Sequence, residues 1–415
     1  MSSVMKKAKA AKSAKEQLAL LSREEKDDAL EAMATALTKE ASWILAENEK
    51  DMQAGRENGL SEALLDRLAL TKERIHSIAE GVREVKKLPD PIGDTVRTWE
   101  RPNGIQIEEV RVPLGVIGMI YEARPNVTAD ASALCLKSGN PVLLRGSSSA
   151  FQTNKAIVDV LHRALDETKL PSLALQLVED TSREAAHEML HLTEDLDVII
   201  PRGGASLIQH VVKNASVPVL ETGVGNCHVY IDESADDRMG VQIAVNAKTD
   251  RPSVCNACET VLIHRDWADQ YAASLVEELK AKGVAIRGDD YMQAHFDGIT
   301  PAETNDWHEE YLNLTVAIRT VPSLNDAIRH IQTYGTGHSE AIVTEETGAA
   351  DEFMARIDAA ALYHNASTRF TDGNEFGFGA EIGISTQKMH VRGPMGLEAL
   401  TASKYLVRGN GQIKE

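Results

Sequence analysis

Hydrophobic residues recur at helical spacing over the first 90 residues of the chain. Apolar positions fall within Leu18–Leu21, Ala29–Leu37 and Ile75–Val85, with charged residues between them. This spacing gathers the apolar side chains on one face of each helix. Pro89 and Pro91 end the pattern, because proline cannot continue a helix. We therefore expect residues 1–90 to be helical.

From Gly115 onward, short apolar runs alternate with helical stretches. Near-continuous apolar strands separated by helices are typical of a parallel sheet that is covered on both faces. We expect this part of the chain to form a doubly wound nucleotide-binding lobe. The runs predict five strands: Val116–Tyr121, Pro141–Leu144, Leu173–Val178, Leu196–Ile200 and Val217–Leu220.

A second alternating series starts near residue 226 and predicts a second α/β lobe. Its expected strands are Cys227–Ile231, Thr260–His264, Val284–Arg287, Leu314–Val321, Ala341–Thr344 and Ala360–His364.

Two further segments lie outside these lobes. Asn103-Gly104 stands between alternating segments and predicts a β-hairpin, and Ser403–Val407 predicts an edge strand. A hairpin inserted between helices and a sheet often makes a subunit contact. We expect residues 1–96 and 112–225 to form the cofactor domain and residues 226–385 the catalytic domain. Residues 97–111 and 397–415 would form an oligomerisation hairpin and a C-terminal strand.

Composition and charge argue against several classes of protein. The 415 residues carry a net charge of −19 with a pI near 5.2, so the surface repels a phosphate backbone and a nucleic-acid partner is not expected. No run approaches the roughly 20 apolar residues of a membrane span. Residues 1–16 lack the apolar core of a signal peptide, and the four cysteines do not form a dense disulfide frame. We expect a cytoplasmic protein.

Cys255 is the candidate nucleophile. It lies 34 positions after Glu221, and each residue lies near the end of an apolar run. A thiolate is a strong nucleophile whose pKa falls beside positive charge, and Arg251 is four residues upstream. Two alternatives stay open at this point. Cys255 can be a small buried hydrophobe, or Cys255 and Cys258 can form a redox or zinc pair, although no second pair at zinc spacing exists.

The candidate cofactor residues follow apolar runs. No G-x-G-x-x-G opens the first sheet, but Gly203-Gly204 precedes a helical stretch and can aim backbone N–H groups at a phosphate. Gly223-x-Gly225 is a weaker candidate, and both sets can simply be tight turns. Arg145 with Ser147 suits a ribose 2′-phosphate, which favours NADP(H), although an arginine exposed to solvent is an equal alternative.

Several motifs resemble a known family. The segment Val321–Ile342 resembles the signature of the gamma-glutamyl phosphate reductase family, also called glutamate-5-semialdehyde dehydrogenases, within the aldehyde dehydrogenase superfamily. Val112–Asn126, Glu221–His228 and Gly393–Leu397 resemble the same family, and the resemblance spans nearly the whole chain. It implies an aldehyde-dehydrogenase-like α/β fold: two doubly wound parallel-sheet lobes plus a small oligomerisation hairpin and tail.

The resemblance also implies residue roles. Cys255 matches the nucleophile and Asn126 the oxyanion donor. Arg145 occupies the place of a lysine that approaches the adenosine ribose, and Glu310 that of a glutamate that holds the nicotinamide ribose. Glu221 matches the base that activates hydrolytic water. Since a reductase that releases phosphate should not hydrolyse its thioester, Glu221 is expected to tune Cys255 or contact the nicotinamide instead.

The implied reaction is the NADPH-dependent reduction of L-glutamyl 5-phosphate to L-glutamate 5-semialdehyde and phosphate through a cysteine thioester, the second step from glutamate to proline. The candidate substrate-binding cations are Arg124, Arg251, Arg369 and Lys388, with Arg369 preferred for the α-carboxylate. No metal is expected. A homodimer or a multiple of it is expected, with a possible transient contact to glutamate 5-kinase.

Two rival functions remain. An acyl-CoA-dependent aldehyde dehydrogenase would share Cys255 and the cofactor lobe but not the Val321–Ile342 signature. A binding or structural protein with a decayed dehydrogenase fold would not need Cys255 for any turnover.

Overall fold

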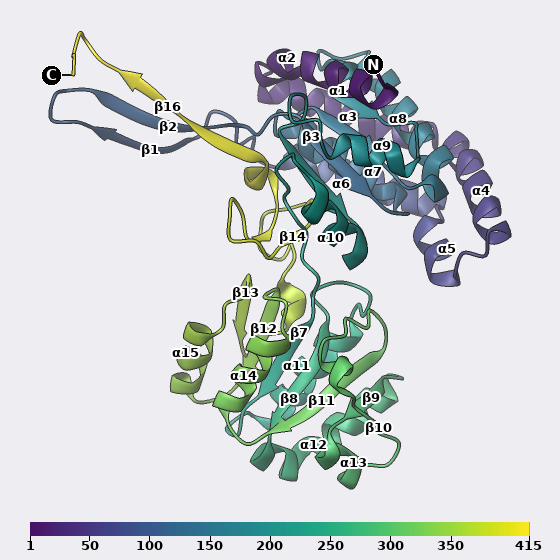
Figure 1. Ribbon diagram of the computed structural model, residues 1–415, viewed down its shortest axis with the longest axis vertical. Coiled ribbons are helices and arrows are strands. Elements are labelled where there is room, and N and C mark those ends of the chain that lie inside the picture. Colours follow the sequence, from purple (N-terminus) through teal and green to yellow (C-terminus); the bar gives the residue numbers. More distant parts are fainter. Residues whose placement is uncertain (415) are drawn as a thin grey trace. The chain divides into compact units, whose positions relative to one another are not determined.

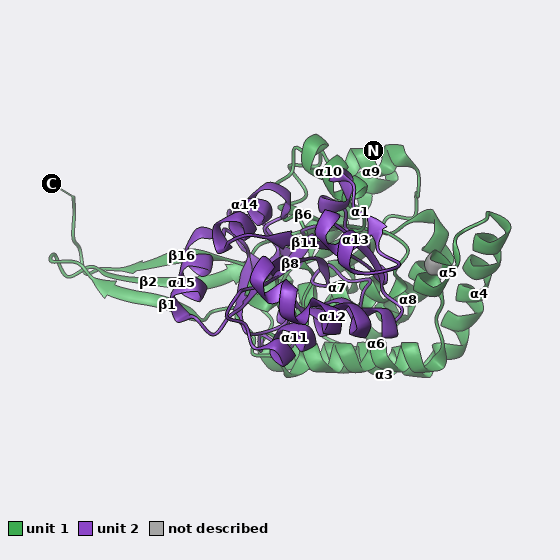
Figure 2. Ribbon diagram, turned by 90° about the horizontal axis from the view of Figure 1, so that it is seen from below, with its two compact units in different colours: residues 1–222, 378–383, 395–415 green, residues 223–377, 384–394 purple. Residues whose placement is uncertain are grey.

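The computed structural model describes residues 1–414, and of Ala63 only the backbone. The chain divides into two compact units, which Figure 2 distinguishes by colour. Unit 1 comprises residues 1–222, 378–383 and 395–415, and unit 2 comprises residues 223–377 and 384–394. Within the described residues, no helix has the length and apolar character needed to cross a bilayer.

Unit 1 begins with helices, as the apolar spacing predicts. They are α1 (Ser3–Ser13), α2 (Lys15–Ala19), α3 (Arg23–Lys39), α4 (Ala41–Glu57), α5 (Glu62–Leu68) and α6 (Lys72–Lys87). Several of these helices begin at an N-cap residue whose side chain accepts a backbone hydrogen bond. Ser22 and Glu25 form a capping box at α3, and the Thr71 hydroxyl accepts the Arg74 N–H at α6. α6 ends at Lys87, just before Pro89.

The first sheet of unit 1 is parallel, in the order β5-β4-β3-β6. Its strands are β3 (Ile117–Tyr121), β4 (Val142–Arg145), β5 (Leu175–Leu177) and β6 (Val198–Arg202). The helices between and after them are α7 (Pro125–Lys137), α8 (Phe151–Leu165), α9 (Arg183–Met189) and α10 (Ala205–Asn214), with 3₁₀ turns η1 (Ser148–Ala150) and η2 (Ser172–Ala174).

The expected fifth strand, Val217–Leu220, is wrong as a strand. It makes one isolated parallel bridge, between Ile199 and Val219, at the edge of β6. Pro218 has no N–H to extend the ladder, although its carbonyl accepts the Ile199 N–H at 2.8 Å.

A second sheet of unit 1 is antiparallel and runs away from the helices as a narrow ribbon (Figure 1). It has the order β1-β2-β16, with β1 (Thr95–Glu100), β2 (Gln106–Pro113) and β16 (Thr401–Arg408). The hairpin turn contains Gly104 at φ +81°, a backbone conformation that glycine adopts without strain. The 3₁₀ turn η5 (Leu397–Leu400) leads into β16.

Unit 2 holds a parallel sheet of seven strands in the order β10-β9-β11-β8-β7-β12-β13. The strands are β7 (Cys227–Ile231), β8 (Cys258–His264), β9 (Ala285–Gly288), β10 (Thr300–Pro301), β11 (Thr315–Val321), β12 (Ser339–Val343) and β13 (Ala361–His364). All six strands expected from the sequence are present, and the two-residue β10 was not foreseen. The two parallel sheets of the expected α/β fold class are present.

The remaining elements of unit 2 are helices and short pieces. The helices are α11 (Asp237–Thr249), α12 (Arg265–Ala281), α13 (Asp290–His295), α14 (Leu324–Tyr334) and α15 (Thr347–Arg356). The 3₁₀ turns are η3 (Thr304–Trp307) and η4 (Thr368–Phe370), and β14 (Ile384–Ser385) pairs antiparallel with β15 (Gly393–Pro394).

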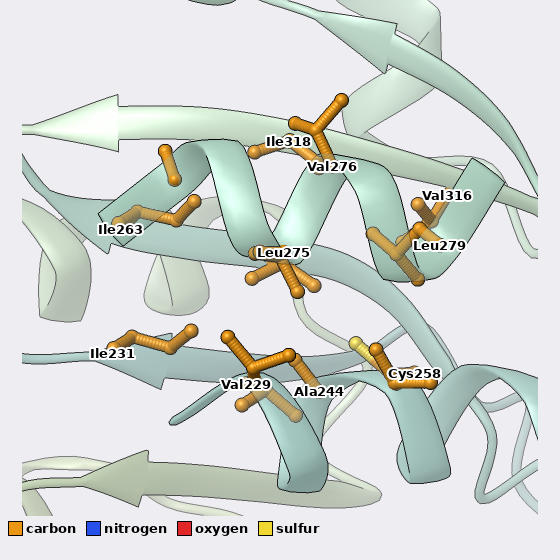
Figure 3. Close-up of a cluster of buried hydrophobic side chains, with 14 of the residues drawn as sticks. Val229, Ile231, Ala244, Cys258, Ile263, Leu275, Val276, Leu279, Val316 and Ile318 are labelled. Atoms are coloured by element: carbon orange, nitrogen blue, oxygen red, sulfur yellow. The ribbon is translucent and has the colours of Figure 1, made fainter. Parts of the chain in front are cut away.

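The core of unit 2 packs α11 and α12 against the sheet. Figure 3 shows Val229 and Ile231 of β7 with Leu275 and Leu279 of α12 in one buried cluster. Cys258, the first residue of β8, belongs to this cluster and is fully buried.

Candidate active site

Cys255 differs from the other three cysteines in exposure. Within residues 1–414 the four cysteines form no disulfide; Cys135, Cys227 and Cys258 are buried, whereas Cys255 is half-buried. Burial raises the pKa of each buried thiol, that of Cys258 to about 12. Because the thiolate is the nucleophilic form, these three residues are poor nucleophiles at neutral pH. Cys255 therefore remains the candidate.

The loop that carries Cys255 is tied down by the next residue, Asn256. The Asn256 amide donates to the Thr371 carbonyl at 2.8 Å, and the Thr368 hydroxyl donates to the Asn256 carbonyl at 2.7 Å. Both partners belong to or follow η4, more than 110 residues away in sequence. The backbone beside the thiol thus has a fixed position within unit 2.

Arg369 lies directly against this loop. Its guanidinium donates to Asn256 Oδ1 and to Asp250 Oδ2, the latter at 3.0 Å, and its side chain is 17% exposed. The Arg369 guanidinium, the preferred ligand for the substrate α-carboxylate, therefore lies next to the segment that carries Cys255. It already forms an ion pair with Asp250. Arg251 is exposed on the same loop. Lys388 instead pairs with Asp358.

Gly225 connects Cys255 to Glu310. A Cβ atom at Gly225 would lie 1.5 Å from the Cys255 carbonyl oxygen, so only glycine fits there. The Gly225 N–H donates to Glu310 Oε1 at 2.8 Å. Burial raises the pKa of the Glu310 carboxyl. Gly225 thus has a packing role beside the nucleophile, and it holds the expected ribose-binding carboxylate within the same neighbourhood.

In unit 1, Asn126 is exposed in the first turn of α7. Its amide donates to Asp130 Oδ2 at 3.0 Å, one helical turn further on. Burial raises the pKa of Asp130 to about 6, against the lowering effect of the Asn126 hydrogen bond. Arg124 is half-buried at the N-cap of the same helix. The N-terminus of α7 therefore presents a side-chain amide at the positive end of a helix dipole.

Glu221 is half-buried and follows the isolated bridge at Val219. The next residue, Thr222, donates from its hydroxyl to the Pro201 carbonyl of β6 at 3.1 Å. The backbone of Glu221 is thereby held at the carboxyl end of the first sheet.

A cleft of about 910 Å³ opens at the carboxyl ends of β3 and β4 in unit 1. This is the edge at which doubly wound sheets bind nucleotides. Arg145 and Ser147 line the cleft, together with Ser206 and His210 of α10. Arg145 Nη2 donates to the Thr181 and Ser182 carbonyls at 2.8 and 3.0 Å, while its buried Nε has no partner within the described residues. The Arg145 side chain lines the cleft, and a guanidinium suits a phosphate oxygen.

Gly203 and Gly204 end β6 and cap α10, as expected for a phosphate loop. However, the Gly204 N–H donates to the Glu122 carboxylate at 2.9 Å, and a Cβ at Gly203 would meet that same carboxylate at 2.7 Å. An anionic side chain thus already occupies this helix N-terminus. A phosphate would have to displace Glu122, so the direct role expected of Gly204 does not fit this arrangement.

Potential metal ligands gather away from Cys255. In the described part of the chain, Glu233, His264 and Asp266 form the one group of three whose ligand atoms lie within 4.8 Å of each other. His264 already accepts the Asp266 N–H at 3.2 Å as the cap of α12. The group lies at the carboxyl ends of β7 and β8, whereas Cys255 precedes the amino end of β8.

Comparison with known proteins identifies the family of the chain. Residues 2–294 match the model of the aldehyde dehydrogenase family. A gamma-glutamyl phosphate reductase from Halalkalibacterium halodurans is 61% identical, with complete coverage of both chains. This chain belongs to the aldehyde dehydrogenase family, and within it to the gamma-glutamyl phosphate reductases.

Solved structures show the same relationship. The crystal structure of gamma-glutamyl phosphate reductase from Thermotoga maritima matches with a TM-score of 0.97 at 47% identity, covering all of both chains. An acetylating aldehyde dehydrogenase from Geobacillus thermoglucosidasius covers 99% of this chain and 97% of its own, with a TM-score of 0.73 at 17% identity. The second match reflects a shared fold alone.

The sequence analysis missed the residues that hold the candidate site together. Asp130, Glu122 and Asn256 each bind a candidate residue or its backbone. Asp130 could have been found from the sequence, since it is the one acidic residue of α7 and lies four residues after Asn126. Nothing in the sequence around Asn256 indicates its pairing with residues 368–371.

Proposed function

We propose that this protein reduces L-glutamyl 5-phosphate to L-glutamate 5-semialdehyde with NADPH and releases inorganic phosphate. The observation that carries the proposal is the position of Cys255. Its loop contacts Gly225, which binds Glu310, and includes Asn256, which binds Arg369. A thiol between a candidate cofactor ligand and a candidate carboxylate ligand suits acyl transfer followed by reduction. The full-length similarity to gamma-glutamyl phosphate reductases supports the choice of substrate.

In the first step the Cys255 thiolate attacks the γ-carbonyl carbon of the acyl phosphate. A C–S bond forms, and the C–O bond to phosphate breaks with its electron pair leaving on inorganic phosphate. Asn126, at the N-terminus of α7, would donate to the oxyanion of the tetrahedral intermediate. Loss of one such donor typically costs about 3–4 kcal/mol of transition-state stabilisation.

NADPH supplies the hydride that reduces the thioester. Collapse of the resulting adduct breaks the C–S bond, returns the electron pair to the Cys255 sulfur and releases the aldehyde. Arg145 and Ser147 would hold the adenosine end of the nucleotide, and Glu310 the nicotinamide ribose. Glu221 would contact the nicotinamide or tune Cys255, because activating water would waste the thioester.

The substrate carries two anionic groups that need cations. Arg369 would meet the α-carboxylate by sharing its guanidinium with Asp250. Arg251 and Arg124 would meet the leaving phosphate. Acid catalysis is of little use here, since the acyl phosphate is already activated.

The reverse reaction tests the proposal. Glutamate 5-semialdehyde should sustain NADP⁺ reduction beyond a single turnover only when phosphate is added, and coenzyme A should not replace phosphate. Cys255→Ala should lower turnover on the order of 10⁴-fold or more, because the covalent route is lost. Cys258→Ala is the matched control, a buried thiol three residues away, and should keep the activity. Activity with coenzyme A in place of phosphate would favour an acylating aldehyde dehydrogenase, and unchanged turnover in Cys255→Ala would contradict the mechanism.

Arg145 tests the choice of cofactor. Arg145→Ala should raise the KM for NADPH about 10- to 100-fold, since a charge-assisted hydrogen bond to the 2′-phosphate contributes roughly 1.5–3 kcal/mol. The substitution also releases the Thr181 and Ser182 carbonyls, and that loss affects NADH and NADPH alike. The increase in the KM for NADPH divided by the increase in the KM for NADH therefore measures the contact with the 2′-phosphate. Equal effects on both cofactors would remove Arg145 from this role.

A further inference from the structure

A buried ion pair lies in unit 2 next to the candidate site. Lys248 of α11 and Glu259 of β8 are both fully buried, with Nζ and Oε2 2.5 Å apart. Burial raises the pKa of the Glu259 carboxyl, against the lowering effect of Lys248. Desolvation of two charges offsets most of their attraction, so such a pair adds little net stability. Its position beside the candidate site therefore calls for another explanation.

The second oxygen of Glu259 binds the segment that carries Glu310. Glu259 Oε1 accepts the Leu312 N–H at 3.2 Å. Leu312 has φ +54°, in the left-handed region that a leucine rarely adopts, so its backbone needs support from its surroundings. Lys248 also lies 6.0 Å from the centre of the Tyr311 ring, close enough for a cation–π contact. The pair thus contacts both residues that follow Glu310.

The same contacts also connect Glu310 to the nucleophile. Glu310 accepts the Gly225 N–H, Gly225 packs on the Cys255 carbonyl, and Glu259 is four residues after Cys255 on the same segment. Cys255 and Glu310 are thus connected by backbone segments, two hydrogen bonds and one packing contact. A shift of Leu312 would therefore move the Glu310 carboxylate relative to Cys255.

We propose that Lys248 and Glu259 are positioning residues that hold the Glu310 carboxylate in register with Cys255 through the Leu312 amide. Lys248 orients the Glu259 carboxylate, and Glu259 fixes the left-handed turn after Glu310. This inference rests on the cofactor role of Glu310 put forward above.

The decisive variant is Lys248→Met with Glu259→Met, which removes both charges and the acceptor while keeping side-chain size. A buried ion pair replaced by apolar residues of similar volume usually leaves a folded protein. The KM for NADPH should rise roughly tenfold, because a small misplacement of a ligand weakens binding and catalysis strongly. Alkylation of Cys255 by iodoacetamide without cofactor should change less than about twofold, because Asn256 and Gly225 still hold its loop.

Two further variants separate positioning from general stability. Lys248→Met with Glu259→Gln keeps an amide oxygen for the Leu312 N–H, and should restore the KM for NADPH to within about threefold of the wild type. Lys26→Met with Asp90→Leu removes a matched pair in unit 1, in which Asp90 binds Lys26 at 2.6 Å and the Ile92 N–H at 3.0 Å. It should leave the KM for NADPH unchanged.

Glu310→Gln tests separately whether Glu310 binds the cofactor, which is the premise of this inference. If Glu310→Gln raises the KM for NADPH and the double methionine variant does not, the positioning role is overturned. A parallel change in Cys255 alkylation and in thermal stability would also overturn it, since that is the signature of a merely structural pair. If Glu310→Gln does not change the KM for NADPH, Glu310 does not bind the cofactor. The positioning role of Lys248 and Glu259 is then overturned as well.

Discussion

At the scale of single residues, the Asn126–Asp130 pair links the candidate oxyanion donor to a titratable group. One hydrogen bond of 3.0 Å joins them, and burial raises the pKa of Asp130 to about 6. The folded protein therefore binds a proton more tightly at Asp130 than the unfolded chain does. Its contribution to stability is complete below the unfolded pKa and is lost as pH rises through about 6.

The variant Asp130→Asn, which cannot ionise, should be more stable than the wild type at about pH 8 and equal to it near pH 3. A shift of two pKa units corresponds to about 3 kcal/mol, and partial solvent exposure reduces the expected gain to about 1 kcal/mol. Urea midpoints at the two pH values measure this. Asp28→Asn, at an exposed position of α3, should show no such dependence. Equal midpoints for the wild type and Asp130→Asn at the higher pH would contradict the role of burial.

At the scale of elements, the loop before β8 depends on a close approach between two backbones. Gly225→Ala should destabilise unit 2 by at least about 2 kcal/mol and alter the alkylation rate of Cys255, because the new methyl group overlaps the Cys255 carbonyl. Gly348→Ala is the control, since nothing lies within 4 Å of its Cβ position in α15. It should stabilise by about 0.5 kcal/mol through helix propensity. A Gly225→Ala variant with wild-type stability and thiol reactivity would exclude this contact.

The elements themselves were largely predictable, because they depend on local periodicity. Apolar runs such as Cys227–Ile231 are read correctly from their composition and spacing. Val217–Leu220 is also an apolar run, but Pro218 and its edge position limit it to one bridge. The contacts of the site were not predictable, since Gly225 meets Glu310 and Asn256 meets Thr371 across 85 and 115 residues. Tertiary structure alone determines such pairings.

At the scale of the whole molecule, the β1-β2-β16 ribbon exposes apolar side chains and two open strand edges. Val96, Tyr405 and Val407 are 48%, 56% and 59% exposed, and Tyr405 packs edge-on against Trp99 with 6.1 Å between ring centres. Open edges and exposed apolar residues favour pairing with another chain. We therefore expect the ribbon to contact a second subunit.

Tyr405→Lys with Val407→Lys should lower the sedimentation coefficient at micromolar concentration, because it places two charges on the expected interface. Met354→Lys, at an exposed apolar position of α15, should not change it. A wild-type protein that sediments as a monomer under these conditions would contradict the expectation.

The central claim concerns the sulfur of Cys255 as the carrier of the acyl group. The protein can be incubated with glutamate 5-semialdehyde and NADP⁺ without phosphate, so that the thioester forms and is not released. Peptide mass spectrometry after rapid quenching should then find a glutamyl adduct on Cys255 in the wild type, and none in Cys255→Ala. An adduct on Cys135, Cys227 or Cys258, or NADP⁺ reduction without any cysteine adduct, would contradict the account.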